Sequence, residues 1–316
     1  KPFGGRGFID RIHPVAIGHR NAVGAAWDPA AARLYTTDWG TTSLDEINIV
    51  GGGDNMGWNV VLGACDGHPG IEELEHCDST TDPFYQYYLT GQKSALPVGI
   101  LPIDTDRIAP FSGSILVTTL LDGLHLVEPK DDRPQAIGHH RYATDFLGDG
   151  ENSPVRAIHR TPSGTIYVAT YHEPDDEGPR DVIVRIDSAE RPPSIEEIEP
   201  LELRDVVTDL DIPWEILWGY DNTIWMTERG GRVSRVDPVS GETAHLLTIP
   251  SVEEVENTGL LGMALHPNFC DTPSVYLVYT WRAEDGQLFE RLVAYNYEVT
   301  ADTLVDEEVL LDSVPV

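Results

Sequence analysis

Three consecutive polar residues with different chemistry stand at the start of the stretch GHRNAVGAAWDP, residues 18–29. The His19 imidazole can exchange a proton near neutral pH, the Arg20 guanidinium can hold a carboxylate, and the Asn21 amide can donate and accept hydrogen bonds. A small-residue strand and a turn follow them. The three side chains either cap a surface turn or face a site that needs a fixed cation and an amide.

The three cysteines are a second set of reactive groups. Cys65 and Cys77 bracket the polar loop CDGHPGIEELEHC, whereas Cys270 stands alone in HPNFCDTP. A disulfide between the first two is expected if the protein is extracellular. A zinc site that also uses His68 and His76 is the weaker interpretation, because the loop lacks a CxxC pair.

The charge excludes one class of partner. The 53 Asp and Glu residues against 21 Lys and Arg give a formal net charge of −32, so we expect no binding to nucleic acid. Lysine occurs only at positions 1, 93 and 130. Such an acidic, lysine-poor surface indicates a halophilic organism, and an acidic secreted protein from an ordinary habitat is the alternative. The sequence has no apolar run long enough to span a membrane.

The elements that must position these residues follow one repeated pattern. An apolar strand, a turn with Pro, Asp or Gly, and a second strand rich in Tyr, Val, Ile and Thr recur in five segments: residues 25–40, 98–123, 155–172, 214–237 and 262–281. The turns lie roughly 50 to 75 residues apart, a spacing that suits propeller blades with inserted loops. We therefore predict one all-β propeller domain over residues 1–316, and a β-sandwich is the alternative. The acidic loops at 65–83 and 172–182 would decorate a rim.

Four stretches resemble one known family. They are GHRNAVGAAWDP, DEINIVGGGDNMGWNVV (45–61), DIPWEILWGYDNTIWMTERGGRV (211–233) and NTGLLGMALHPNF (257–269). The set is similar to the soluble glucose/sorbosone dehydrogenases, six-bladed propellers that use pyrroloquinoline quinone and calcium to oxidise aldose sugars. The resemblance implies a six-bladed β-propeller and a quinoprotein oxidoreductase that acts on a small-molecule sugar at C1.

The order of these stretches differs from the family's order. In the family the PWEI and GLLG segments precede GHRN and DEIN, whereas here they follow them. The sequence thus resembles a circular permutant, in which residues 186–200 are the expected linker between the two rotated parts. The family's H-x-G-G stretch, which carries its catalytic histidine, is absent, so we expect one blade to be incomplete or missing and predict no catalytic residue. None of the 11 histidines stands in that context.

The resemblance also implies cofactor-binding residues. Arg20, Asn21 and Arg156 match positions that contact the quinone, and a tricarboxylated quinone suits guanidinium and amide donors. Two further cationic positions of the family fall at Leu121 and Pro154, so those charges are lost. The loss of two charge-assisted contacts favours weaker cofactor binding.

Substrate and metal positions follow from the same resemblance. Asn257 matches a sugar-contacting amide. Gly40 and Thr41 fall where the family offers two backbone carbonyls to calcium, and Asp45 and Glu46 match the acidic pair after that loop. In an alternative interpretation, these two carboxylates anchor the loop by accepting backbone N–H bonds.

Two functions of different class remain open at this point. The first is the sugar-oxidising quinoprotein, and the second is a propeller without catalysis that acts as an extracellular or cell-surface binding or assembly module. A missing blade would leave open sheet edges that another chain could fill, which predicts possible self-assembly. A calcium-dependent hydrolase is a weaker option, because the sequence offers no nucleophile context for it.

Overall fold

A computed structural model of the protein describes residues 14–40, 44–61, 63, 77–87, 95–103, 113–121, 123–128, 138–142, 154–172, 181–187, 202–255 and 257–316. Within these ranges the regular elements are strands, apart from the short 3-10 helix η1 (Cys77–Ser79). No helix in this part of the chain is long and apolar enough to cross a membrane.

The strands form five antiparallel sheets of four strands each, and every sheet uses four consecutive strands. We number the sheets as blades I to V in chain order. Blade I contains β1 (Ala22–Asp28), β2 (Arg33–Asp38), β3 (Glu46–Val50) and β4 (Tyr85–Gln86); blade II contains β5 (Pro97–Pro102), β6 (Ile115–Thr119), β7 (Gly123–Glu128) and β8 (Gly138–Tyr142). Blade III contains β9 (Val155–Arg160), β10 (Ile166–Thr170), β11 (Asp181–Asp187) and β12 (Glu202–Leu210). Blade IV contains β13 (Pro213–Trp218), β14 (Ile224–Glu228), β15 (Arg232–Val236) and β16 (Thr243–Thr248); blade V contains β17 (Leu260–Leu265), β18 (Ser274–Arg282), β19 (Leu288–Glu298) and β20 (Thr303–Pro315).

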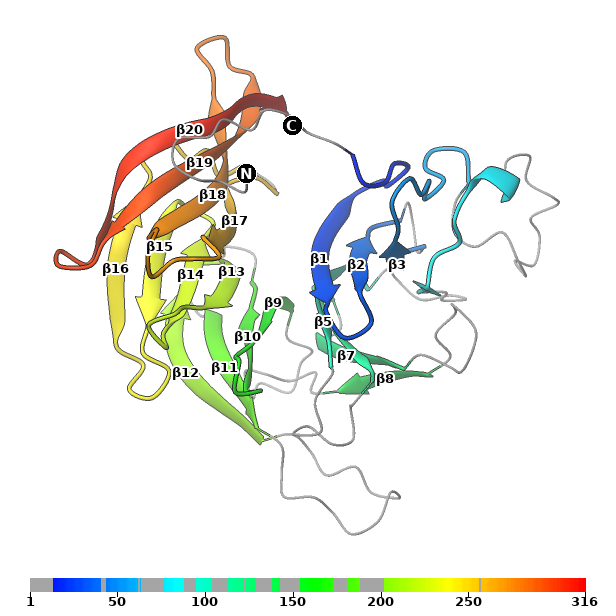
Figure 1. The fold of residues 1–316 in the computed structure, drawn as a ribbon, viewed down its shortest axis with the longest axis horizontal. Helices are drawn as coiled ribbons and strands as arrows, with labels where there is room; N and C mark the ends of the chain where they lie inside the picture. The colour runs from blue at the N-terminus through cyan, green and yellow to red at the C-terminus, as the bar shows by residue number, and fades with distance from the viewer. Residues whose placement is uncertain are drawn as a thin grey trace.

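The blades are arranged around a central axis with the first strand of each blade innermost (Figure 1). β1 packs beside β5, β5 beside β9, β9 beside β13 and β13 beside β17, whereas no comparable packing joins β17 to β1 within the described ranges. The predicted all-β propeller is therefore confirmed. Of the six blades predicted, one of them incomplete or missing, the described residues form five. Those five are the five repeated segments of the sequence, whereas the sixth blade was implied only by the family resemblance.

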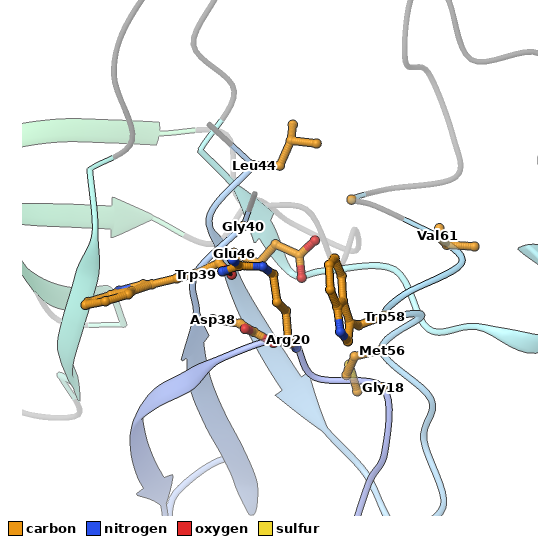
Figure 2. A pocket seen from close by; sticks show the side chains of 11 residues that line it. Gly18, Arg20, Asp38, Trp39, Gly40, Leu44, Glu46, Met56, Trp58 and Val61 are labelled. Atoms are coloured by element: carbon orange, nitrogen blue, oxygen red, sulfur yellow. Dashed lines mark hydrogen bonds between the residues drawn. The ribbon is translucent and has the colours of Figure 1, made fainter. Parts of the chain in front are cut away.

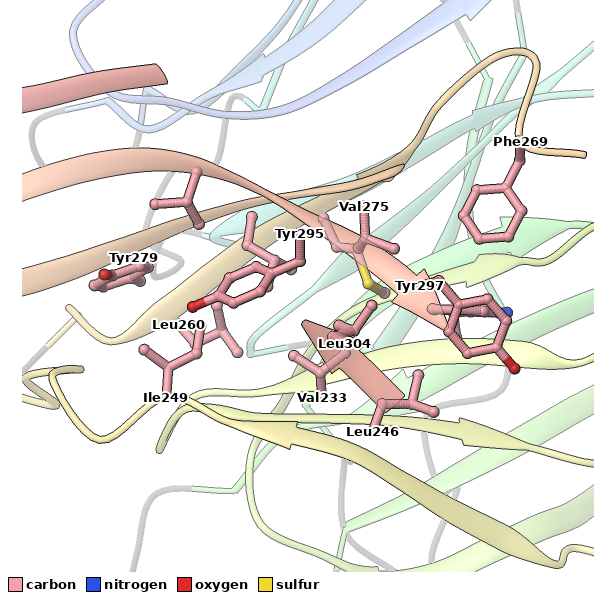
Figure 3. Packing of buried hydrophobic residues seen from close by; sticks show 14 residues of the cluster. Val233, Leu246, Ile249, Leu260, Phe269, Val275, Tyr279, Tyr295, Tyr297 and Leu304 are labelled. Carbon is pink, nitrogen blue, oxygen red and sulfur yellow. The ribbon is translucent and has the colours of Figure 1, made fainter. Parts of the chain in front are cut away.

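Apolar side chains fill the spaces between neighbouring blades, because a four-stranded meander cannot bury its own faces. Separate clusters lie between blades I and II, II and III, III and IV, and IV and V. The cluster between blades IV and V is the most aromatic and is drawn in Figure 3. There, Trp225 of β14 packs edge-on against Tyr297 of β19, with ring centroids 5.1 Å apart. These contacts fix each blade relative to the next and so position the inner strands.

Two sequence predictions concern connections between strands. Cys77 is disulfide-bonded and Cys270 is a free thiol, while Cys65, the partner expected for Cys77, lies outside the described residues. Residues 188–201, which include most of the predicted linker, also lie outside them. The strands on either side of that segment, β11 and β12, pair with each other in blade III.

Candidate functional site

One carboxylate at the end of β2 holds the polar row at residues 19–21. Asp38 Oδ2 accepts the Arg20 backbone N–H at 3.1 Å and lies 3.0 Å from His19 Nδ1. Its Oδ1 accepts the Asn21 backbone N–H at 2.6 Å. The pairing of β1 with β2 starts at Ala22 opposite Asp38. The loop that leads into β1 therefore ends beside this carboxylate. Three interactions with Asp38 therefore fix the backbone of the loop.

The side chains of Arg20 and Asn21 lie against different cavities. Arg20 Nη1 donates to the Trp39 carbonyl at 3.0 Å, and its guanidinium carbon lies 5.4 Å from the centroid of the Trp58 ring. Asn21 instead lines the cavity at the centre of the ring. Trp39 lines both spaces: its backbone carbonyl accepts from Arg20, and its indole Nε1 donates to the Pro97 carbonyl at 2.8 Å. The two residues that were expected to hold one cofactor therefore line two different cavities.

A small pocket, which we call the rim pocket, lies at the end of blade I beside Arg20 (Figure 2). Its lining includes Gly40, Glu46 and Trp58, and its volume is about 20 Å³. That space suits an ion or a water molecule rather than an organic cofactor. The rim pocket therefore brings together Arg20 with two of the four residues expected at the calcium site.

The acidic pair after this loop divides into two environments. Asp45 Oδ1 accepts the Gly40 backbone N–H at 3.0 Å and Oδ2 accepts that of Leu96 at 3.0 Å, which is the loop-anchoring arrangement. Glu46 lines the rim pocket, and burial, assisted by the nearby charge of Asp38, raises its pKa to about 7. Asn48 opposes this rise by donating to Glu46 at 3.4 Å.

Few of the residues predicted to bind calcium lie together in the described structure. The described ranges contain no cluster of three or more His, Cys, Asp or Glu that could hold a metal ion. Thr41 lies outside the described residues. Of the four predicted metal positions, only Gly40 and Glu46 line the rim pocket.

A larger cavity of about 400 Å³ lies among the innermost strands, and we call it the hub cavity. Three predicted site residues line it, although they come from distant parts of the chain: Asn21, Arg156 and Asn257. The sequence did not single out the aromatic and acidic residues that accompany them: Trp39, Tyr171, Trp214, Glu215 and Glu290. This mixture of aromatic faces, amides and charged groups suits a polar organic ligand.

β-Bulges in the innermost strands direct residues toward the hub cavity. Each innermost strand has an irregularity near its start, and the residues there line the hub cavity as consecutive pairs. The second member of the pair is Gly or Ala in four blades. In blade I the reason is a close approach of the next blade, because a Cβ on Gly24 would meet the Val98 carbonyl oxygen at 1.8 Å. The five pairs are Val23–Gly24, Val98–Gly99, Arg156–Ala157, Trp214–Glu215 and Leu261–Gly262.

Arg156 is the buried cation of the hub cavity. It is 8% exposed, and its guanidinium carbon lies 3.9 Å from the centroid of the Trp214 ring, a cation–π contact. Its Nε has no hydrogen-bond partner within the described part of the chain. Burial lowers the pKa of Arg156 to about 10, against the opposing charges of Glu215 and Tyr171, so the side chain stays cationic at neutral pH. A buried N–H without an acceptor is costly and suits an external anion.

Glu215 is the functional candidate that sequence reasoning missed. Burial raises its pKa to about 7, against the charge of Arg156 and a backbone hydrogen bond from Ile216. Alignment of the five repeats offers one signal, because a glutamate stands where the other blades have Gly or Ala. A carboxyl with a pKa near neutrality can exchange a proton with a ligand in this cavity.

Comparison with known proteins extends these observations. The family model described as glucose/sorbosone dehydrogenase matches residues 2–178 and 210–316. Among curated proteins, quinoprotein glucose dehydrogenase B of Acinetobacter calcoaceticus is 33% identical over 125 residues, which is 37% of this chain and 26% of that protein. An uncharacterized protein of Synechocystis is 26% identical over 155 residues, which is 49% of this chain and 35% of that protein. The chain thus spans about a quarter and about a third of the lengths of these two relatives.

Solved structures give similar partial overlaps. The PQQ-bound form of an aldose sugar dehydrogenase from Streptomyces coelicolor shares 23% identity with a TM-score of 0.37, over 53% of this chain and 43% of that one.

Proposed function

Because the chain belongs to the glucose/sorbosone dehydrogenase family, we propose that it is a quinoprotein oxidoreductase that oxidises aldose sugars at C1 with pyrroloquinoline quinone and calcium. When bound, the quinone supplies the electron acceptor for a hydride from the sugar. The chain's own residues then bind and orient the two ligands.

The unpaired Nε of Arg156 in the hub cavity is the observation that carries this proposal. The quinone's carboxylates provide the acceptor that this N–H lacks, and the Trp214 ring holds the guanidinium in one orientation. Asn21, which lines the same cavity, would contact the quinone through its amide. Arg20 would act from the rim pocket, where it donates to the Trp39 backbone carbonyl.

The sugar would lie in the remaining part of the hub cavity. The rings of Tyr171, Trp214 and Trp39 offer apolar faces that exclude water and suit the C–H faces of a pyranose. Asn257 would donate to or accept from a sugar hydroxyl.

Calcium would lie in the rim pocket. The volume of this pocket fits an ion, and a bound cation would favour the ionised form of Glu46, whose pKa burial raises to about 7. Gly40 and Glu46, with Thr41 from the same loop, would supply oxygen ligands, whereas both oxygens of Asp45 already accept backbone N–H groups.

The test is cofactor binding and turnover by Arg156→Gln. We expect its affinity for pyrroloquinoline quinone to fall by about 10- to 100-fold, because it loses one charge-assisted contact. Arg33→Gln, an exposed arginine at the start of β2 that lines neither cavity, is the control and should bind as the wild type does. Fluorescence titration with the quinone measures affinity, and dye reduction with aldoses and calcium measures turnover. Absence of quinone binding by the wild-type protein would reject the proposal.

A non-catalytic binding or assembly module is the second candidate. It is favoured by the lining of the hub cavity, which includes no histidine within the described ranges, whereas the family's base is a histidine. Quinone binding without turnover of any aldose would favour this candidate. Self-assembly through open blade edges predicts particles larger than one chain in sedimentation velocity.

We also propose an extracellular or cell-surface location in a halophilic organism. The disulfide at Cys77 supports an oxidising compartment, and the net charge of −32 supports high salt. Thiol labelling of protein taken directly from its native host tests the first point. A fully reduced Cys77 would contradict it.

A further inference from the structure

Glu215 occupies a position that the packing of the fold does not require to be acidic. The other four blades have Gly or Ala at the second place of the bulge pair, and at Gly24 and Gly99 an added Cβ would meet atoms of the next blade. Blade IV instead has a glutamate at this place, which lines the hub cavity and interacts electrostatically with Arg156. Buried carboxyl groups are costly unless they are paired or neutral. An unneeded acid in a ligand-sized cavity therefore points to a role toward the ligand.

Arg156 and Glu215 approach the cavity from neighbouring strands. β9 packs beside β13, and the Arg156 guanidinium lies over Trp214, the residue that precedes Glu215. No hydrogen bond or ion pair joins the two side chains in the described structure, and Arg156 Nε has no acceptor. The Arg156 guanidinium is thus available to an external anion. Glu215 interacts electrostatically with the same guanidinium, so an ionised Glu215 would repel that anion.

We propose that a carboxylate-bearing ligand binds Arg156 in the hub cavity only when Glu215 is protonated, so that binding takes up one proton at Glu215. Two carboxylates beside one guanidinium repel each other in a cavity that excludes water, whereas a protonated Glu215 becomes a hydrogen-bond donor to the ligand. The carboxylate can come from the quinone cofactor, in which case the inference rests on the proposed function, or from a sugar acid.

The other charged groups around Glu215 do not duplicate this role. On β9, Arg156 keeps its positive charge at neutral pH, and burial, assisted by the charge of Arg160, lowers the pKa of His159 to about 4, so that His159 is neutral between pH 6 and 8. Tyr171 lines the same cavity and interacts electrostatically with Arg156. Burial raises the pKa of Glu215 to about 7. Glu290 of β19 is a second carboxyl in the lining with a raised pKa, and it serves as the matched control.

Isothermal titration calorimetry tests the inference. The wild-type protein is titrated with pyrroloquinoline quinone, and separately with D-glucuronate and D-glucose, at pH 6, 7 and 8 in pairs of buffers that differ in ionisation enthalpy. With either carboxylate we expect uptake of about half a proton at pH 7 and of about one proton at pH 8, and an affinity that falls roughly fivefold from pH 7 to pH 8. Glucose, which has no carboxylate, should show no such uptake.

The variants locate the proton. Glu215→Gln should bind both carboxylates with an affinity that changes less than about twofold from pH 6 to 8, and without proton uptake. Glu290→Gln should keep the wild-type pH dependence. If Glu290→Gln removes the uptake and Glu215→Gln keeps it, the assignment to Glu215 is overturned. If Glu215→Gln does not unfold cooperatively, the buffer dependence of the wild-type protein decides alone.

Failure of this inference differs from failure of the proposed function. Quinone binding with a pH-independent affinity and no proton uptake overturns the inference and leaves the cofactor proposal standing. Proton-coupled binding of glucuronate without quinone binding supports the inference and rejects the cofactor. No binding of either carboxylate to the wild-type protein at pH 6 overturns both.

Discussion

The acidic side chains at the site have two different roles, structural support and proton exchange, because their surroundings differ. Asp38 and Asp45 are almost fully buried, yet both accept backbone N–H groups of neighbouring loops. Glu46 and Glu215 lie in cavities, and burial raises the pKa of each to about 7. The two aspartates therefore hold the loops, and the two glutamates are the groups whose charge depends on pH and on what binds nearby.

Asp38→Asn tests the support of the polar row. The amide can accept at only one atom, and its NH2 faces N–H donors that previously met a carboxylate. We expect the free energy of unfolding to fall by about 2 to 3 kcal/mol, since hydrogen bonds to a charged acceptor are lost. Urea denaturation measures this loss. The control is Asp209→Asn, an exposed residue at φ 61° whose side chain accepts only the Thr208 hydroxyl within the described structure and whose conformation asparagine tolerates. Equal stability losses in the two variants would contradict the assigned role.

Glu215→Gln tests the cost of ionising a buried carboxyl. Because the pKa of Glu215 is raised on folding, the folded state binds more protons than the unfolded state between about pH 4 and 7. The wild-type protein should therefore lose stability as the pH rises through this window, with no further contribution from Glu215 above it. We expect this loss to be smaller in the variant by on the order of 1 to 3 kcal/mol. Denaturant unfolding at pH 5 and pH 8 measures the difference, and parallel pH profiles for the two proteins would contradict it.

At the scale of elements, threonine hydroxyls connect the second strand of one blade to the bulge of the next. Thr37 donates to the Val98 carbonyl at 2.9 Å, and Thr227 donates to that of Leu261 at 3.0 Å. A bulge removes a carbonyl from the sheet ladder, and the hydroxyl of the neighbouring blade satisfies it. Ala169 stands at the equivalent place in blade III and has no hydroxyl.

Adjacent threonines of β2 provide a matched pair for testing this connection. Thr37→Val leaves the Val98 carbonyl without its donor and should lower the free energy of unfolding by about 1 to 3 kcal/mol. Thr36→Val removes a buried hydroxyl that has no partner among the described residues, so stability should stay unchanged or rise slightly. Thermal and urea unfolding of both variants measures the contrast. A larger loss for Thr36→Val than for Thr37→Val would contradict the connection.

The repeated blades could be predicted from the sequence, whereas the bulges could not. Alternating apolar residues and turn residues recur in every unit, and this local pattern fixes the strands. A bulge depends on how two strands pair, so no single stretch reveals that Arg156 and Ala157 both line the cavity. The separation of Arg20 from Asn21 depends likewise on the bonds that Asp38 makes from another strand.

At the scale of the whole molecule, four inter-blade cores set the arrangement, and the sixth blade expected from the family is not among the described sheets. The five repeated segments of the sequence correspond to the five sheets of the described residues. The hub cavity requires inner strands from separate blades, so Asn21, Arg156 and Asn257 come together only when the ring forms. Their shared location could be expected from family resemblance but not from spacing along the chain.

The net charge of −32 opposes the folded ring, because it brings together carboxylates that the unfolded chain keeps apart. Salt should therefore raise the melting temperature, and most of the rise should occur below about 0.5 M KCl, where the screening length has already shortened to about 4 Å. A sulfate series separates this effect from general salting-out, which continues to grow with concentration. Differential scanning calorimetry measures both series. A melting temperature that falls, or that does not change, between 0.05 and 0.5 M KCl would show that repulsion among the acidic residues does not limit the stability of this propeller.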